Sequence, residues 1–287
     1  AAEASAVVAA GAGGDRPHSS PVITSTANPR VRAIAALSRR SERDQQGLFP
    51  VEGVRVIERA LAAGWPLDRI VLSPELATAA ATDLAGRGGV RVIELGAEAF
   101  RRASYRQHPD GILAVAVARP LPLGDLSMAG DGLVLVVEGI EKPGNLGAVL
   151  RTADAAGVDA VIAADGATDP FNPNVVRASQ GSLFTVPLAV ASAQEAANWL
   201  TDRRLAVYVA HPDGGDAPWD IDLTVGCAVV VGSEHAGLSP LWEGYPAVTV
   251  PMAGAADSLN TATAAAVIAY EARRQQSRGG GVQPHEP

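Results

Sequence analysis

Three short segments of this chain combine polar side chains with glycines in a pattern that could hold a ligand. They span residues 145–152, 232–239 and 257–263. Their polar members are Asn145, Arg151, Glu234, Ser258 and Asn260. Amides, a carboxylate and a guanidinium can together orient a polar ligand and stabilise charge that develops on an oxygen atom. The sequence therefore predicts a polar site, provided that the fold brings the three segments together.

The first segment allows two interpretations. It opens a predicted helix, and a helix N-terminus with a guanidinium nearby can bind a phosphate or an oxyanion. Arg151 lies one turn beyond Gly147, so we expect its side chain to cover the bare glycine backbone. In the alternative, Asn145 only caps the helix, and Arg151 forms a surface ion pair with Asp154 or Asp159.

The other two segments also have a functional and a structural interpretation. Gly232 and Glu234 follow the apolar run 227–231, and a glycine at a strand end lets the backbone approach a ligand closely. Ser258 and Asn260 precede an alanine-rich helix. In the structural alternative, Glu234 accepts hydrogen bonds from loop amides, and Ser258 is the N-cap of that helix.

Composition limits the class of protein. The chain has 287 residues, of which 47% are hydrophobic, enough for one large or two ordinary domains. The net charge of −8 argues against a protein that coats nucleic acid, so RNA contact would need a local basic patch. Lys142 is the only lysine, and the single cysteine, Cys227, excludes disulfides and cysteine-based zinc sites. These features fit a reducing cytoplasm, and no apolar run reaches membrane-spanning length.

Strands and helices alternate along the chain, which predicts two α/β domains. We expect a disordered leader over 1–20, a first domain over 21–118, a linker over 119–130, a second domain over 131–275 and a disordered tail over 276–287. The first domain has predicted helices at 30–40 and 53–63 and strands at 70–72, 90–93 and 112–117. The second has predicted strands at 133–137, 158–163, 205–210, 228–231 and 247–250, with helices at 145–156, 192–202 and 259–274. Its valine-rich strands indicate a parallel sheet that binds ligands beyond the carboxyl ends of the strands.

The three polar segments, in this order and spacing, resemble the signature motifs of the SpoU/TrmH branch of the SPOUT RNA methyltransferases. Segments 28–30, 47–53 and 107–112 resemble the substrate-binding domain of that family. The resemblance implies an L30e-like RNA-binding domain followed by a methyltransferase domain with a parallel sheet and a deep trefoil knot. It also implies a homodimer that binds S-adenosylmethionine, with residues of both subunits at each site and no metal ion.

The family pattern assigns roles by position. Gly232, Val250 and Leu259 would contact the cofactor through their backbone. Met252 would line an apolar slot of the same site or, in the structural alternative, fill the core. The polar active-site residues would be Asn145, Arg151, Glu234, Ser258 and Asn260. In this scheme a ribose 2′-hydroxyl attacks the methyl group, and Arg151 stabilises the developing alkoxide.

RNA recognition would fall to the first domain, where basic residues outnumber nearby acids and predict a patch that positions phosphates. The patch comprises Arg30, Arg32, Arg39, Arg40, Arg43, Arg55 and Arg59. A solvated helix face is the structural alternative.

The resemblance favours large-subunit ribosomal RNA as substrate, with resistance to a ribosome-targeting antibiotic as a narrower expectation. The alternatives are a transfer-RNA methyltransferase and a non-catalytic protein that binds RNA or assists ribosome assembly. A nicotinamide-dependent enzyme is disfavoured, because no G-x-G-x-x-G motif follows the first predicted strand of either domain.

Overall fold

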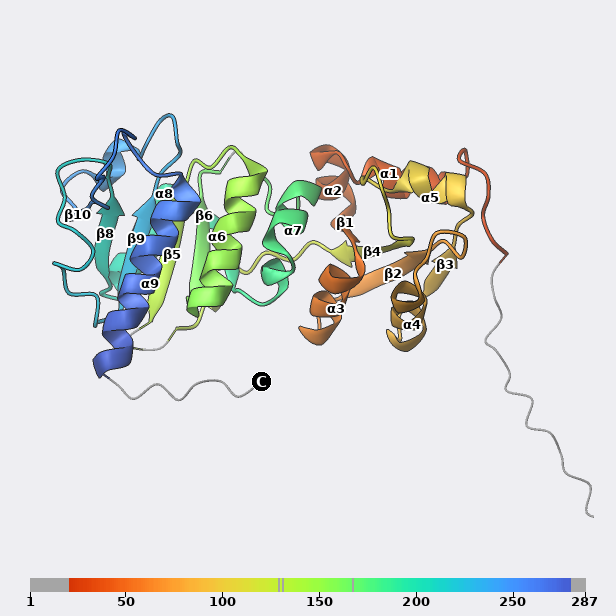
Figure 1. Ribbon diagram of the computed structural model, residues 1–287, viewed down its shortest axis with the longest axis horizontal. Coiled ribbons are helices and arrows are strands. Elements are labelled where there is room, and N and C mark those ends of the chain that lie inside the picture. Colours follow the sequence, from red (N-terminus) through yellow and green to blue (C-terminus); the bar gives the residue numbers. More distant parts are fainter. Residues whose placement is uncertain (1–20, 129, 131, 167, 280–287) are drawn as a thin grey trace, which may run out of the picture.

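The protein contains two sheets that lie side by side along its long axis (Figure 1). The structure is a computed structural model that describes residues 21–279 except 129, 131 and 167. The first sheet has four strands and the second has six, and helices cover both. The chain therefore forms the two α/β units that its alternating pattern predicts.

The four-stranded sheet carries helices on both faces. Its strands are β1 (Leu48–Glu52), β2 (Leu67–Leu72), β3 (Val92–Glu94) and β4 (Ile112–Val117), in the order β1-β4-β2-β3. β4 pairs antiparallel with β1 and β2, and β2 pairs parallel with β3. Leu113 and Val115 pack with α1 (Pro29–Ala36) and α5 (Ala97–Ala103), whereas Ala114 packs with α3 (Val54–Ala62) and α4 (Ala79–Arg87). This alternation is what a central strand covered on both faces requires.

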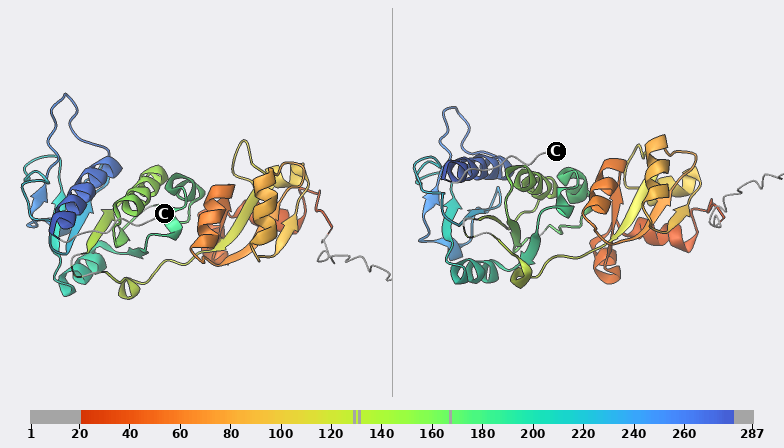
Figure 2. Two further views of the ribbon diagram at one scale, coloured as in Figure 1. Left: turned by 60° about the horizontal axis from the view of Figure 1, so that its bottom comes forward. Right: turned by 90° about the horizontal axis from the view of Figure 1, so that it is seen from below.

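The six-stranded sheet is parallel throughout. Its strands are β5 (Leu133–Glu138), β6 (Ala160–Ala164), β7 (Leu188–Ala191), β8 (Ala206–Ala210), β9 (Cys227–Val231) and β10 (Ala247–Val248), in the order β10-β8-β9-β5-β6-β7. Leu135 faces a layer made by α6 (Pro143–Ala156), α7 (Pro173–Ser179) and α9 (Thr261–Gly279). Val136 faces α8 (Ala193–Asp202) on the opposite side (Figure 2). The described residues also form the single-turn helices η1 (Leu123–Asp125), η2 (Ser182–Phe184) and η3 (Pro240–Trp242).

Most of the predicted elements are present, with some differences. The predicted helix 30–40 is two helices, α1 and α2 (Arg40–Gln46), because Leu37 caps α1 and buries its side chain. The hydrophobic pattern does not predict β1, α5, α7 or β7, which are all short. The predicted leader lies outside the described residues. The tail predicted over 276–287 begins inside α9, and residues 280–287 lie outside the described part. In the described part of the chain, no helix is both long and apolar enough to cross a membrane.

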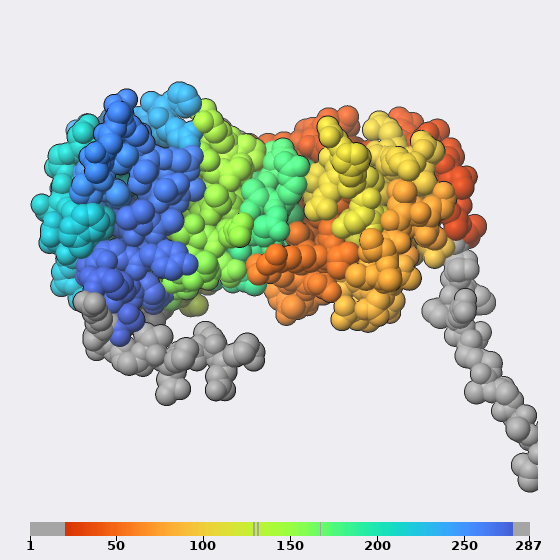
Figure 3. All heavy atoms as spheres, in the orientation of Figure 1, coloured from red at the N-terminus to blue at the C-terminus, as the bar shows by residue number. Residues whose placement is uncertain are grey.

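An aromatic cluster joins the two domains. Phe49 of β1 and Trp65 come from the first domain, and Phe171 and Phe184 come from the second. The ring centroids of Phe49 and Phe171 are 4.7 Å apart, and those of Trp65 and Phe184 are 5.2 Å apart, as in favourable aromatic pairs. In the space-filling view, α7 abuts the first domain without a visible gap (Figure 3). The two domains therefore share one apolar core.

A buried ion pair accompanies the aromatic cluster. Arg43 of α2 is only 3% exposed, and its Nη2 lies 2.6 Å from Oδ2 of Asp169. Its Nη1 donates to the carbonyl oxygens of Leu37 at 2.9 Å and Ser38 at 3.0 Å. Such hydrogen bonds are what allow a charged pair to remain buried. Arg43 is therefore a structural residue, and its assignment to a surface basic patch is wrong.

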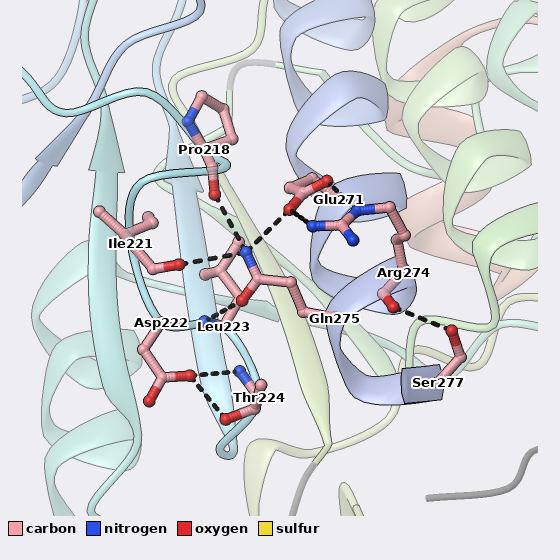
Figure 4. A network of polar contacts seen from close by, with 9 residues as sticks. All are labelled: Pro218, Ile221, Asp222, Leu223, Thr224, Glu271, Arg274, Gln275 and Ser277. Carbon is pink, nitrogen blue, oxygen red and sulfur yellow. Dashed lines mark hydrogen bonds and ion pairs between the residues drawn. The ribbon is translucent and has the colours of Figure 1, made fainter. Parts of the chain in front are cut away.

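The C-terminal end of α9 is tied to the loop that precedes β9. The side-chain amide of Gln275 donates to the carbonyl oxygens of Pro218 at 3.3 Å and Ile221 at 3.1 Å (Figure 4). The same side chain accepts from the backbone N–H of Leu223 at 2.9 Å. Glu271, one turn earlier on α9, also accepts from this amide, at 2.8 Å. Backbone groups of a distant loop thus hold the last helix in place.

Replacing Phe171 with alanine should destabilise the protein by about 3–5 kcal/mol, the usual cost of deleting a buried phenylalanine side chain. The change removes the contact with Phe49 and opens a cavity between the domains. Chemical denaturation followed by circular dichroism measures the free energy of unfolding. Val190→Ala is the matched control, because Val190 is 49% exposed and such surface changes stay within roughly 0.5 kcal/mol. Equal stability of the two variants would show that the domains do not share a core.

Cys227 should be inert toward thiol reagents in the folded protein. Its side chain is buried in β9, and burial raises the pKa of its thiol to about 12. Because only the thiolate reacts, reaction at mildly alkaline pH has to wait for unfolding. We expect a chromogenic disulfide reagent to titrate this single cysteine in guanidinium chloride and to detect almost none in buffer. Rapid reaction of the native protein would contradict the buried position of β9.

Candidate active site

The three polar segments meet at one edge of the six-stranded sheet. β5 and β9 are adjacent and parallel, so the loops that follow them lie side by side at the carboxyl ends of the strands. The first loop ends at Lys142 and leads into α6, whose first turn carries Asn145, and the second loop carries Glu234. The third segment joins them because Thr261, at the start of α9, donates its hydroxyl to the carbonyl oxygen of Gly232 at 3.1 Å. Strand order thus brings distant segments together.

Lys142, Asn145, Glu234 and Asn260 form a hydrogen-bonded group that we call the Glu234 cluster. The carboxylate of Glu234 accepts from Nδ2 of Asn145 at 2.9 Å, from Nδ2 of Asn260 and from Nζ of Lys142. Nδ2 of Asn260 also donates to Oδ1 of Asn145 at 3.2 Å. The hydrogen bond from Lys142, followed by that from Asn145, lowers the pKa of Glu234. Glu234 is therefore an ionised carboxylate at neutral pH, surrounded by donors.

The backbone at the start of α9 fixes Asn260, whereas Asn145 is held by the side chains of Glu234 and Asn260. Oδ1 of Asn260 accepts from the backbone N–H two residues later at 3.0 Å, which turns its Nδ2 toward Glu234. Asn260 therefore caps α9, and the interpretation of Ser258 as the N-cap is wrong. Lys142 is the N-cap residue of α6, and Asn145 lies inside the first turn. The interpretation of Asn145 as a simple cap is therefore wrong as well.

A cleft of about 680 Å³ opens beside Glu234. It is lined by all the residues predicted to bind a cofactor, which are Gly232, Val250, Met252 and Leu259. Ser258 lines it as well. Apolar side chains such as Leu238 and Ile268 stand beside polar groups, and the volume lies within the range of about 300–1,000 Å³ typical of small-molecule sites. Across the described residues, no group of three or more His, Cys, Asp or Glu side chains could hold a metal ion. The volume and the mixed apolar and polar lining suit an organic ligand.

The loop 232–239 is fixed at both ends. A Cβ atom on Gly232 would lie 2.4 Å from the carbonyl group of Gly237, so the turn requires glycine. Glu138, at the end of β5, is 4% exposed and accepts from the backbone N–H of Ser239 at 2.8 Å and from its Oγ at 2.7 Å. These contacts hold Glu234 at the rim of the cleft. The motifs do not single out Glu138, although a carboxylate that ends an apolar strand is a signal that could have identified it.

Arg151 lies outside the Glu234 cluster within one chain. It is exposed on α6, and it does not line the cleft. Its expected position over Gly147 is wrong because α7 occupies that space: a Cβ atom on Gly147 would lie 2.5 Å from Cβ of Ala178. The expected surface ion pair is also wrong: Asp154 pairs with Arg59 at 3.5 Å, and Asp159 accepts from the backbone N–H of Leu133 at 2.9 Å. Arg151 has no ion-pair partner among the residues that the structure describes.

The residues predicted to contact RNA lie on the first domain. Arg30, Arg32, Arg39 and Arg40 are exposed on or beside α1 and α2. A hollow of about 470 Å³ beside α1 is lined by Arg32, Arg39 and also Arg102 of α5, which the basic pattern does not include. Contact of these residues with RNA stays a prediction.

Lys142 is the member of the Glu234 cluster that the motifs do not single out. Its Nζ contacts the carboxylate of Glu234, and no other cation of the described residues reaches that carboxylate. The available signal was compositional, because this is the only lysine among 23 basic residues and it directly precedes the proline that begins α6. The site therefore contains a cation, at a different position from the expected Arg151.

Comparison with protein families divides the chain as the two sheets do. Residues 132–270 match the SpoU rRNA Methylase family. Residues 28–114 match the MRM3-like substrate binding domain. The first match contains the Glu234 cluster and the cleft, and the second contains the helices around the four-stranded sheet.

Curated relatives are similar over most of the chain. It is 34% identical to the 23S rRNA (uridine(2479)-2′-O)-methyltransferase of Streptomyces viridochromogenes, over 85% of this chain and 89% of that protein. It is 32% identical to the 23S rRNA (guanosine(2553)-2′-O)-methyltransferase RlmP of Bacillus subtilis, over 88% of this chain and 98% of that protein.

Solved structures match both domains. The crystal structure of the SpoU methyltransferase AviRb from Streptomyces viridochromogenes, in complex with the cofactor AdoMet, has a TM-score of 0.81 and 32% identity. That match covers 87% of this chain and 98% of the other. An RNA 2′-O ribose methyltransferase has a TM-score of 0.79 and 38% identity, over 89% of this chain and 99% of the other. With identity above 30% over nearly the full length of these proteins, the chain belongs to the SpoU rRNA methylase family.

Proposed function

We propose that this protein methylates a ribose 2′-hydroxyl of 23S ribosomal RNA, with S-adenosylmethionine as the methyl donor. The observation that carries the proposal is the Glu234 cluster at the rim of a ligand-sized cleft. Both curated relatives described above are named as 23S rRNA 2′-O-methyltransferases. Protection against a ribosome-targeting antibiotic remains an expectation from sequence resemblance.

The lining of the cleft suits the chemistry of S-adenosylmethionine, which combines an adenine ring with a charged amino-acid tail. Val250, Met252 and Leu259 offer apolar surface, and the turn at Gly232 brings backbone groups close to the cleft. The similar AviRb structure contains AdoMet. When bound, this cofactor supplies an electrophilic methyl group. These four residues would hold it next to Ser258 and Glu234.

The Glu234 cluster would bind and orient the ribose. Asn145 and Asn260 are already held by Glu234, so little freedom is lost when the 2′-hydroxyl enters. Preorganised donors of this kind stabilise the negative charge that develops on the attacking oxygen. The hydroxyl proton would pass to an RNA phosphate oxygen or to Glu234, which is ionised and exposed at the rim. Near-attack positioning therefore accounts for much of the proposed catalysis.

We further propose a homodimer in which Arg151 of the partner subunit completes each site. Arg151 lies on an outward stripe of α6, between Ala148 and Ala155 and in line with Gly144. Small residues on such a stripe let a second helix approach closely. The neighbouring α9 exposes Tyr270, which is 52% accessible. Pairing of the α6–α9 faces of two subunits would bury this surface and place the guanidinium near the other cleft.

A deep trefoil knot in the second domain is also part of the proposal. β9 inserts between β5 and β8, and the chain then passes beyond β8 to β10 before α9 returns to pack against α6. The attachment of Gln275 to the loop 218–223 supports this path (Figure 4). A chain that is threaded in this way would keep the cleft-forming loops together.

Asn260→Ala should lower methyl transfer to 23S ribosomal RNA by about 10²–10³-fold, as loss of a preorganised polar group typically does. Labelled methyl transfer onto unmodified ribosomal and transfer RNA, with mass-spectrometric mapping of the ribose, measures it. Asn198→Ala, an exposed asparagine of α8 on the other face of the sheet, is the control and should be fully active. If the wild-type protein binds the cofactor but transfers a methyl group to neither RNA, it is a non-catalytic RNA-binding protein. If it methylates transfer RNA alone, the proposal of a ribosomal RNA substrate is wrong.

Arg151→Ala should abolish transfer while cofactor affinity stays unchanged, because Arg151 does not line the cleft of its own chain. Mixing and re-equilibrating Arg151→Ala with Asn260→Ala subunits tests whether the arginine acts across the dimer. If it does, activity should return to about one quarter of wild type, since half of the dimers are mixed and each mixed dimer has one complete site. Two inactive variants that stay inactive when mixed would place Arg151 in its own subunit's site.

A further inference from the structure

We propose that Lys142 binds the RNA phosphate next to the ribose that is methylated, a role that rests on the proposed function. Lys142 lies in the loop between β5 and α6, beside Asn145 and Glu234. Lys142 is not one of the residues that the family motifs assign to the site. It does not line the cleft, so a contact with the cofactor does not explain why a lysine is present here.

The geometry leaves the ammonium group available to a ligand. The side chain of Lys142 is 61% exposed, whereas that of Glu234 is 22% exposed. An ammonium group has three N–H donors, and the contact with Glu234 uses one of them. No other acceptor among the described residues contacts this ammonium group, so two donors remain for a ligand. Glu234 thus holds the charge in place and leaves most of its hydrogen-bonding capacity unused.

The other members of the Glu234 cluster cannot supply a positive charge to a phosphate. Asn145 and Asn260 are neutral amides, and Glu234 is itself an anion. Arg151 lies on another face of α6 within the same chain. Among the described residues, Lys142 is therefore the cation that one chain brings to this cluster.

Charge balance explains why a cation is needed here. The RNA backbone is a polyanion, and the ionised carboxylate of Glu234 alone would repel a phosphate that approached Asn145. Lys142 neutralises that carboxylate and adds an attractive group for phosphate oxygens. On a protein with a net charge of −8, such local compensation favours the approach of the target nucleotide.

The test compares Lys142→Met, Lys142→Arg and Arg87→Met with the full-length wild type. Arg87 is the matched control, because it is also 61% exposed and is also paired with carboxylates, those of Glu58 and Asp83, on the first domain. Affinity for a 23S ribosomal RNA fragment is measured at several salt concentrations. Loss of one phosphate contact lowers the slope of log affinity against log salt by about 0.7–0.9.

We expect Lys142→Met to bind the fragment more weakly, with the slope reduced by about one contact, and Lys142→Arg to restore it. Arg87→Met should keep the wild-type slope, and all variants should keep wild-type cofactor affinity. RNA should also slow acetylation of Lys142, followed by mass spectrometry of the peptide that contains it, since this is the only lysine of the chain. An unchanged slope for Lys142→Met, failure of arginine to restore it, or no protection by RNA would overturn the proposal.

An effect of Lys142→Met on only the dependence of activity on pH would also contradict the proposal. If Lys142→Met only moved the acidic limb of the pH–rate profile to higher pH, Lys142 would act through the pKa of Glu234, and the phosphate contact would be refuted. The sign follows because the lysine lowers that pKa, so its removal lets Glu234 protonate at higher pH. Wild-type protein that binds RNA but methylates none would refute the proposed function, while the salt slopes would still report on Lys142.

Discussion

The pairing of β9 with β5 is the constraint on which the rest of the site depends. Asn145 and Glu234 are 89 residues apart in the chain, yet their side chains are joined by a hydrogen bond. Parallel pairing makes this contact possible, because it places the carboxyl ends of both strands at the same edge of the sheet. A β9 strand at either edge of the sheet would leave Glu234 too far from α6. Strand order, more than any single side chain, therefore assembles the active site.

The Glu234 cluster achieves precision without burial. Its polar groups lie at the rim, where each exposed ion pair or hydrogen bond contributes little to stability. Glu234 nevertheless receives donors from α6, from the start of α9 and from Lys142, and its own loop is anchored by Glu138. Cooperation among these contacts restricts rotamers before a substrate arrives. Entry of RNA would then exclude water and strengthen the same contacts.

The shared core between the domains gives the first domain a defined position relative to the site. Phe49 packs on Phe171, and Arg43 reaches Asp169, so both apolar and polar contacts cross the junction. Domains joined only by a linker usually move independently. Here α7 packs against β1 on one side and α6 on the other, and α6 begins within the Glu234 cluster. RNA held on the first domain would therefore meet the active site at a constrained distance.

The sequence predicts the two α/β units and the meeting of Asn145, Glu234 and Asn260, because those residues follow strands whose parallel order sets their position. The same local signals cannot predict which face of a helix a neighbouring element will cover. The expected position of Arg151 over Gly147 is wrong for this reason, because α7 covers Gly147 and is too short for periodicity to reveal. Arg43 was misassigned for the same reason, since its partner Asp169 lies 126 residues away. Local patterns predict the chemistry available at strand ends, whereas burial and pairing of a charge depend on contacts that only the folded chain makes.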